Sequence, residues 1–340
     1  MRKEVVSRAL CVGLLLLLPF AVFAGGAREP TPETFELTAY TILDQRSVLT
    51  QAQIRWAELV EERTGGAVSI DVFHSGELGG DVETVEEMRQ GLIDIRTAGG
   101  GLHAHYYPEM QMTELPFLFR NKEHLQEVLY GPLGEQLYQG FEQHGVKALT
   151  MFDIGFRGIS NTVRPVRSIE DVEGLRIRVP ETDIYILTWE KFGAQPIGMA
   201  WPDVYTSLQT GVLDAQDNAP EHTLSNNTYE VQDYYTWLQY IWMGAVLTLN
   251  LDTWNSLPPE YQDVMIEAGQ EVSEWTFDQL YPAQEEALDE MERRGLQITR
   301  DVDMSGFRRA AEELYEEELG RLDWFDAEWV QAVMELGERF

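Results

Sequence analysis

The chain has 340 residues and carries 58 acidic side chains against 25 basic ones, a formal net charge of −33 at neutral pH. Nucleic acid and anionic membrane surfaces are therefore poor partners for it, because both carry the same sign of charge. A chain of this length is more readily built as two lobes than as one.

The first residues have the pattern of a cleaved secretory signal peptide. Arg2, Lys3 and Arg8 form a basic start, an apolar run follows as far as Phe23, and the run closes at Ala24. The run is short for a membrane anchor, since a spanning helix needs about 20 apolar residues. We therefore expect cleavage after Ala24 and export to the periplasm.

Cleavage would also remove the only cysteine, Cys11. A mature chain without cysteine has no disulfide, no catalytic thiol, no cysteine-bound metal and no lipid-anchored N-terminal cysteine. No later stretch is long and apolar enough to cross a membrane, because polar residues such as Gln239 and Asn250 interrupt the aromatic-rich segment 234–251.

Strands and helices alternate along the first third of the mature chain. Period-2 patterns predict strands at 35–41, 67–73 and 92–101, the last running into a glycine loop. Helical periodicity predicts amphipathic helices at 51–64 and 81–91. This order is typical of an α/β domain with a largely parallel sheet.

The alternation resumes in the middle of the chain. Two helices are predicted within 121–145, and further helices at 182–193 and 201–211; the strands between and around them are predicted at 146–155, 174–179, 194–200 and 212–218.

A long helical pattern dominates the last third. It runs from residue 258 to residue 295 and contains Pro282, which suggests a kinked helix laid across the protein. Residues 305–340 predict acidic amphipathic helices.

Catalytic motifs are weak or missing. The nucleophile elbow and the phosphate-binding loop are absent, and the glycines 99–101 lack the spacing of a dinucleotide loop. His103 and His105 could share one strand face as metal ligands, but no third ligand lies nearby, so ordinary surface or loop histidines are the favoured interpretation.

An acid cluster formed by Asp214, Asp217 and Glu221 could in principle supply acid–base catalysis. Solvated, turn-forming carboxylates are the commoner explanation of such a cluster, and we favour it. We expect no catalytic residue, no metal and no cofactor.

Polar and aromatic side chains gather at predicted strand ends. Arg178 ends a strand that Pro180 stops, Arg157 follows another strand, and Asn218 follows a third. Trp201 lies at a strand-to-helix turn. Ligands of open α/β sheets bind outside the carboxyl ends of the strands, and a guanidinium presents paired donors to a carboxylate. The pattern therefore predicts a site for a small organic acid, although for a lone arginine a surface ion pair is the simpler reading.

The order of these motifs resembles the solute-binding proteins of tripartite ATP-independent periplasmic (TRAP) transporters, of the dicarboxylate-binding type. The resemblance covers nearly all of the mature chain. It includes "WAELVEERTGGAVSIDVFHSGELGG", "ELPFLFRNKEHLQEVL", "GFRGISN", "IEDVEGLRIRVPET" and "FGAQPIGMAWPDVYTSLQTGVLDAQDN". Residues 174–218 carry the most specific part.

The resemblance implies residue roles. Arg178 would form a two-pronged salt bridge with the ligand carboxylate, Arg157 and Asn218 would assist it, and Trp201 would cover one face of the ligand. Further candidate ligand-binding residues are Asp217, Gly99, Gly100 and Asp81. Sialic-acid-binding members carry charged ligand contacts where this chain has glycines 99–101, so sialic acid is not expected. The glycines would leave room for a bulkier or aromatic acid.

The resemblance also implies a two-lobed α/β periplasmic binding protein fold with a ligand cleft between the lobes. Lobe I would hold residues 34–153 and 243–282, lobe II would hold residues 154–242 and 283–340, and a helix at about 258–295 would bridge both.

The expected function follows from the same resemblance. A periplasmic monomer would capture a small organic acid and deliver it to membrane permease subunits for uptake driven by an ion gradient. A ligand-sensing subunit of a signalling receptor would use the same site, and an enzyme built on Asp214 and Asp217 is the remaining alternative. The sequence does not distinguish dicarboxylates, sugar acids, keto acids and aromatic acids as ligands.

Overall fold

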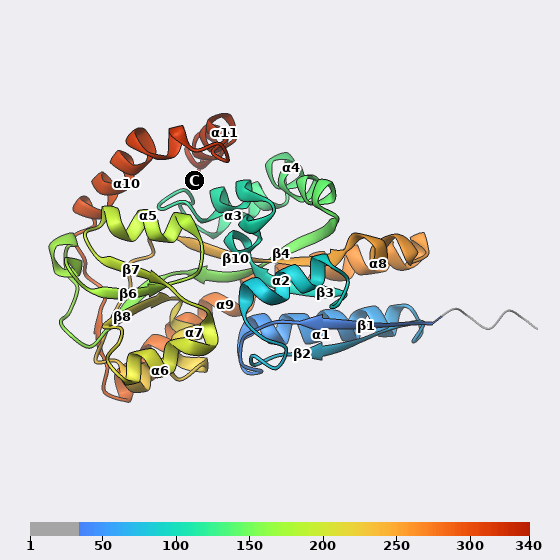
Figure 1. Cartoon of the computed structure of the whole chain (residues 1–340), viewed down its shortest axis with the longest axis horizontal. Coiled ribbons are helices and arrows are strands. Elements are labelled where there is room, and N and C mark those ends of the chain that lie inside the picture. The colour runs from blue at the N-terminus through green and yellow to red at the C-terminus, as the bar shows by residue number, and fades with distance from the viewer. Residues whose placement is uncertain (1–33) are drawn as a thin grey trace, which may run out of the picture. The chain divides into compact units, whose positions relative to one another are not determined.

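Two mixed β-sheets and the helices around them form the part of the chain that this computed structural model describes, residues 34–340 (Figure 1). The described residues form the α/β fold with two sheets that the sequence predicts. The predicted signal peptide and its cleavage site lie outside the described residues.

The first sheet has five strands in the order β2-β1-β3-β10-β4. These strands are β1 (Phe35–Tyr40), β2 (Val68–Phe73), β3 (Ile95–Gly99), β4 (Val146–Phe156) and β10 (Trp242–Asn250). Strand β1 pairs parallel with β2 and β3, as predicted, but β10 enters between β3 and β4 and runs antiparallel to both. The prediction of a largely parallel sheet therefore holds for β1, β2 and β3, and the antiparallel β10 is the strand that it missed.

The second sheet has six short strands in the order β11-β9-β5-β8-β6-β7. Their bounds are β5 Gly158–Asn161, β6 Arg176–Val179, β7 Gln195–Gly198, β8 Ala215–Asn218, β9 Tyr234–Thr236 and β11 Gln297–Thr299. Strand β6 pairs parallel with β7 and β8, whereas β5 pairs antiparallel with β8 and β9. Residue Arg157 alone separates β4 of the first sheet from β5 of the second.

Helix α1 (Val48–Arg63) shows how local sequence sets an element. The Ser47 side chain caps it by accepting a hydrogen bond from the Thr50 amide, which satisfies one of the free donors of the first turn. The helix ends before Gly65 and Gly66, which both adopt positive φ. Its buried face includes Trp56, which packs into the main hydrophobic core.

Helix α9 (Pro259–Arg293) is the long helix predicted from the sequence. Its buried positions recur every three or four residues, among them Met265, Ala268 and Val272. Figure 1 shows α9, in orange, beside α1 and α7, and it also packs on β4 and β11. The helix therefore contacts both sheets, and it continues through Pro282 without interruption.

The remaining helices cover the two sheets. They are α2 (Asp81–Arg89), α3 (Lys122–Leu129), α4 (Pro132–Gly140), α5 (Asp183–Lys191), α6 (Val204–Gln209), α7 (Pro220–Ser225), α8 (Leu251–Ser256), α10 (Ser305–Glu317) and α11 (Ala327–Gly337). The two C-terminal helices close the chain against α5 and α3 (Figure 1). Between residues 34 and 340, no helix has the length and hydropathy needed to cross a bilayer.

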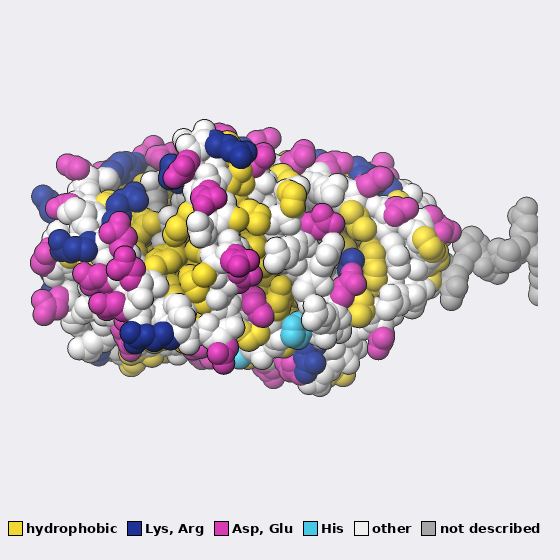
Figure 2. Space-filling model, turned by 90° about the horizontal axis from the view of Figure 1, so that it is seen from above, with side chains coloured by type: hydrophobic (Ala, Val, Ile, Leu, Met, Phe, Trp, Pro, Cys, Tyr) yellow, Lys and Arg dark blue, Asp and Glu magenta, His cyan; other side chains and the backbone are white. Residues whose placement is uncertain are grey.

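Charged side chains cover much of the surface. In Figure 2, acidic side chains are scattered over the visible face together with basic ones, with hydrophobic side chains between them. This arrangement is that of a solvated acidic surface.

The assignment of individual segments to lobe I and lobe II stays a prediction.

Candidate ligand-binding site

A cavity of about 470 Å³, its open mouth included, lies where strand ends of the two sheets meet. Residues at the carboxyl ends of β1, β3, β4, β6 and β8 line it, together with Met243 near the start of β10. Of the predicted ligand-binding residues, the cavity wall brings together Arg178, Arg157, Asn218, Trp201, Asp81 and Gly99.

Arg178 is a buried cation without an acidic partner among the described residues. It ends β6, and its side chain is 3% exposed. Nε donates to the Met199 carbonyl at 2.9 Å, and the guanidinium lies 5.3 Å above the Trp201 ring. Its terminal nitrogens make no hydrogen bond to any residue in 34–340. Burial, followed by the nearby charge of Arg157, lowers the pKa of Arg178 to about 10.

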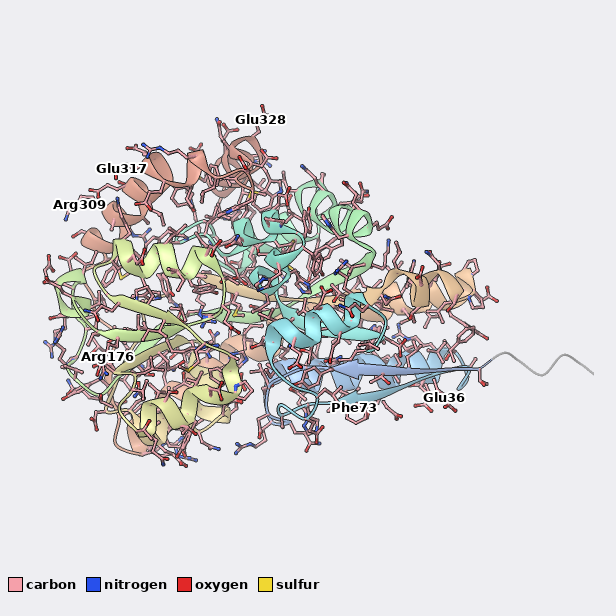
Figure 3. All side chains as sticks on the ribbon, in the orientation of Figure 1. Glu36, Phe73, Arg176, Arg309, Glu317 and Glu328 are labelled. Carbon is pink, nitrogen blue, oxygen red and sulfur yellow. The ribbon has the colours of Figure 1, made fainter. Side chains whose placement is uncertain are left out.

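Arg176, on the same strand, provides a contrast. Arg176, labelled in Figure 3, is half-exposed. It forms an ion pair with Asp214, with Nε–Oδ2 at 2.9 Å and Nη2–Oδ1 at 2.6 Å. The two arginines are two residues apart on one strand, but only Arg178 lies at the end that faces the cavity.

Arg157 also lines the cavity, but the carboxylate of Asp217 neutralises its positive charge. It donates two hydrogen bonds to the Asp217 carboxylate, at 2.7 and 3.0 Å, and a third to the Asp217 carbonyl at 2.6 Å. Asp217 is fully buried and also accepts a hydrogen bond from Tyr240. The predicted ligand-binding residue Asp217 is therefore placed behind the wall, where it neutralises Arg157.

Asn218 lines the cavity, and its amide nitrogen makes no hydrogen bond within residues 34–340. Its Oδ1 atom accepts from the Ala219 amide at 3.0 Å and lies 3.3 Å from His222 Nδ1. His222 also lines the cavity and was not predicted. Burial, followed by the nearby Arg157, lowers the pKa of His222 to about 3, so the imidazole is neutral at physiological pH. The sequence signal that could have identified His222 as a lining residue is its position on helix α7, four residues after Asn218.

Arg96 and Asp81 form a second charge-matched pair in the wall. Arg96 Nη2 and Asp81 Oδ1 are 3.0 Å apart, and Arg96 Nε donates to Thr84 Oγ1 at 3.0 Å. Its guanidinium lies 4.8 Å above the Tyr40 ring. Asp81 was predicted as a ligand-binding residue and Arg96 was not. The position of Arg96 on β3, just before the glycine loop, could have identified it as a candidate.

The glycine loop does not leave open space for a ligand. A side-chain carbon added at Gly99 would overlap the end of Met243, and one added at Gly101 would overlap the Glu114 carboxylate. Gly100 lies beside Thr113 and Glu114 and does not line the cavity. The expectation that these glycines make room for a bulkier acid was wrong, because neighbouring side chains already fill that space.

Two interpretations of polar residues need correction. His103 is fully buried in a 3₁₀ turn, with Nδ1 2.7 Å from the Tyr106 hydroxyl, whereas His105 is exposed, so they do not share a strand face. Asp217 and Glu221 are buried instead of solvated. Their neighbours along the chain are polar, and the burial comes from the surrounding fold.

Comparison with known proteins gives consistent matches. The family model of bacterial extracellular solute-binding proteins, family 7, matches residues 40–320. The 2,3-diketo-L-gulonate-binding periplasmic protein YiaO of Escherichia coli K12 is 29% identical over 256 residues, covering 75% of this chain and 78% of that protein.

Solved structures agree with this match. A TRAP periplasmic solute-binding protein from Polaromonas sp. JS666, bound to D-erythronate, has a TM-score of 0.85 and 26% identity, covering 88% of this chain and 98% of the other. One from Sulfitobacter sp. NAS-14.1, bound to β-D-galacturonate, has a TM-score of 0.83 and 26% identity, covering 90% and 100%. The similarity extends over most of each chain.

Proposed function

The chain belongs to family 7 of the bacterial extracellular solute-binding proteins and is the substrate-binding subunit of a TRAP transporter, and we propose that it binds the carboxylate of a small organic acid through Arg178. The acid occupies the cavity between the two sheets. Arg157 and Asn218 orient it, and Trp201 covers one face. Binding requires no bond to be made or broken, so we propose a binding protein and not an enzyme.

The buried, unpaired Arg178 carries this proposal. A buried charge without a partner costs several kcal/mol, because the protein interior does not replace the water that it loses. The other two arginines in the wall have their own carboxylates, and Arg178 has none among residues 34–340. A ligand carboxylate would supply the missing charge and accept paired hydrogen bonds from the free terminal nitrogens.

The ligands of the relatives support the same chemistry. D-Erythronate and β-D-galacturonate, bound in the two solved structures, and 2,3-diketo-L-gulonate, named for the Escherichia coli protein, are all carboxylates. We propose that the loaded protein is extracytoplasmic and delivers its acid to TRAP permease subunits, as family membership implies.

Titration of the mature chain, residues 25–340, with organic acids and their uncharged amides tests the carboxylate proposal. At about 1,000 times its dissociation constant, a ligand should stabilise the folded state by roughly 4 kcal/mol, which raises the melting temperature by several degrees. We expect the acids to bind and the amides to fail.

The matched variants are Arg178→Ala and Arg176→Ala. Loss of Arg178 should weaken acid binding by at least about 100-fold, because the carboxylate would be buried without its cation. Loss of Arg176, whose ion pair is at the surface, should change the affinity by less than about threefold. If acid and amide bind with equal affinity, or if the two variants have equal effects, then Arg178 does not bind the ligand carboxylate.

A further inference from the structure

The charged side chains around the cavity can neutralise one negative charge of a ligand. Three arginines line it, and two of them are neutralised by carboxylates of the protein: Arg96 by Asp81 and Arg157 by Asp217. Only Arg178 lacks an acidic partner among the described residues. The five groups together therefore supply a single uncompensated positive charge.

No other lining residue adds a second cation. The wall built from residues 34–340 contains no lysine, and its one histidine, His222, stays neutral because burial lowers its pKa to about 3. Glu221, whose Oε2 atom lies 3.4 Å from His222 Nε2, and Arg157 are the charged groups that act on that imidazole. A second ligand carboxylate would therefore be buried without a matching charge.

Much of the rest of the wall is apolar. Hydrocarbon and thioether side chains face the cavity from the first sheet and from the segments after β1; they are Ile42, Leu43, Leu49, Leu102, Ile154 and Met243. Such a wall favours carbon over hydroxyl groups, because a buried hydroxyl needs hydrogen-bond partners.

A few polar groups in the wall remain available. The Thr41 and Thr97 hydroxyls are fully buried and have no hydrogen-bond partner among the described residues. The Asn218 amide nitrogen and the second oxygen of Asp81 likewise make no hydrogen bond there. These groups suit one or two hydroxyl or keto groups, whereas the several hydroxyls of a hexuronate, each both donor and acceptor, would exceed them.

We propose that the ligand is a monocarboxylate with a mainly apolar carbon skeleton that carries one or two hydroxyl or keto groups. This inference rests on the proposed function of the same site. It separates the ligand from C4-dicarboxylates, which bring a second charge, and from hexuronates, which bring too many hydroxyls.

Calorimetric titration of the mature protein, after unfolding and refolding to remove any retained ligand, tests the inference. Three sets of acids are compared: branched 2-oxo and 2-hydroxy monocarboxylates such as 4-methyl-2-oxopentanoate, dicarboxylates such as 2-oxoglutarate and malate, and the hexuronates D-glucuronate and D-galacturonate. We expect the first set to bind at least about tenfold more tightly than the other two.

The outcomes distinguish the inference from the proposed function. A dicarboxylate or hexuronate that binds as tightly as the first set overturns the inference, and the proposed function stands if that binding is lost in Arg178→Ala. Failure of all three sets to bind overturns both.

A charge variant provides a second, independent measurement. Asp81→Asn keeps an acceptor for Arg96 but removes the negative charge, so the cavity gains a second uncompensated cation. We expect 2-oxoglutarate to gain at least about tenfold in affinity relative to 4-methyl-2-oxopentanoate. Asp71→Asn, on the exposed side of β2, is the control for the loss of one acid and should leave the ratio unchanged. If the affinity of Asp81→Asn for 2-oxoglutarate relative to 4-methyl-2-oxopentanoate equals that of the wild type, the inference that the cavity carries one uncompensated positive charge is contradicted.

Discussion

At the scale of single residues, identical side chains differ because their surroundings differ. Arg157 and Arg178 are both buried at strand ends, but Asp217 reaches only Arg157. The sequence places both arginines near a carboxylate-binding position and does not reveal which one is already neutralised. That distinction depends on the pairing of β8 with β5. This pairing places Asp217 opposite Ile159, within hydrogen-bond distance of Arg157.

Asp153 is a second buried group whose surroundings determine its chemistry. It lies on β4, fully buried, and Oδ1 accepts a hydrogen bond from Trp242 Nε1 at 2.7 Å. Oδ2 has no hydrogen-bond partner among residues 34–340. Burial raises the pKa of Asp153 to about 7, against the opposing effect of the Trp242 hydrogen bond. The folded state therefore holds a proton on Asp153 at pH values where the unfolded chain has released it.

Asp153→Asn should stabilise the protein at high pH and not at low pH. A raised carboxyl pKa means that the wild type loses stability as pH rises from about 3.8, the ordinary value, through about 7. Above that window the asparagine variant should be more stable by on the order of 3–5 kcal/mol, and below it the two should converge. Urea unfolding from pH 4 to pH 8.5 measures this. Asp71→Asn should show no such trend, and a gain that is constant with pH would contradict the assignment.

At the scale of elements, periodicity identified those with one buried face. Helix α1, helix α9 and strands β1, β2 and β6 were all predicted near their observed bounds. Strand β10 was missed because eight of its nine residues are buried, so it shows no alternation between apolar and polar positions. Strands β5, β9 and β11 were also missed, and β9 and β11 have only three residues each, too few for a period to emerge.

The contact between β4 and α9 can be tested at Gly155. This residue has a φ of 98°, and a side-chain carbon there would overlap Gln284 and Leu280 of α9. Gly155→Ala therefore combines backbone strain with a steric clash, and we expect it to lower the free energy of unfolding by about 2–4 kcal/mol. Gly145→Ala is the matched control, because Gly145 has a φ of 76° and no atom within 4 Å of the added carbon. It should show only the strain, about 1 kcal/mol. Equal losses in denaturant unfolding would mean that the β4–α9 contact is loose.

At the scale of the whole molecule, two hydrogen bonds join the segment after β1 to the end of α7. The Asp44 amide donates to Asn226 Oδ1 at 3.3 Å, and the Arg46 guanidinium donates to the Ser225 carbonyl. Asp44 and Arg46 follow β1 of the first sheet, whereas Ser225 and Asn226 end α7, which follows β8 of the second. These residues do not line the cavity, so we expect their contacts to stabilise a closed, ligand-bound form of the protein without contacting the ligand.

Asn226→Ala should therefore change how fast the ligand leaves and not how fast it arrives. We expect the dissociation rate to rise about three- to tenfold, with the association rate within about twofold, since most changes within one interface alter dissociation. Stopped-flow measurement of tryptophan fluorescence follows both rates. Thr210→Ala, at an exposed helix end, is the control. A fall in the association rate alone would show that Asn226 acts on entry and not on closure.

The sequence by itself determined the class of the fold, the long helix, and six of the residues that line the cavity, because periodicity, strand-ending prolines and motif order are local properties of the chain. Only the tertiary structure decided the charge state of that cavity. The pairs Arg96–Asp81 and Arg157–Asp217 join residues 15 and 60 positions apart, and the packing of Met243 beside Gly99 depends on where β10 enters the first sheet. Electrostatic and packing energies depend on distances in space, and these distances are set by strand order, which no local pattern encodes.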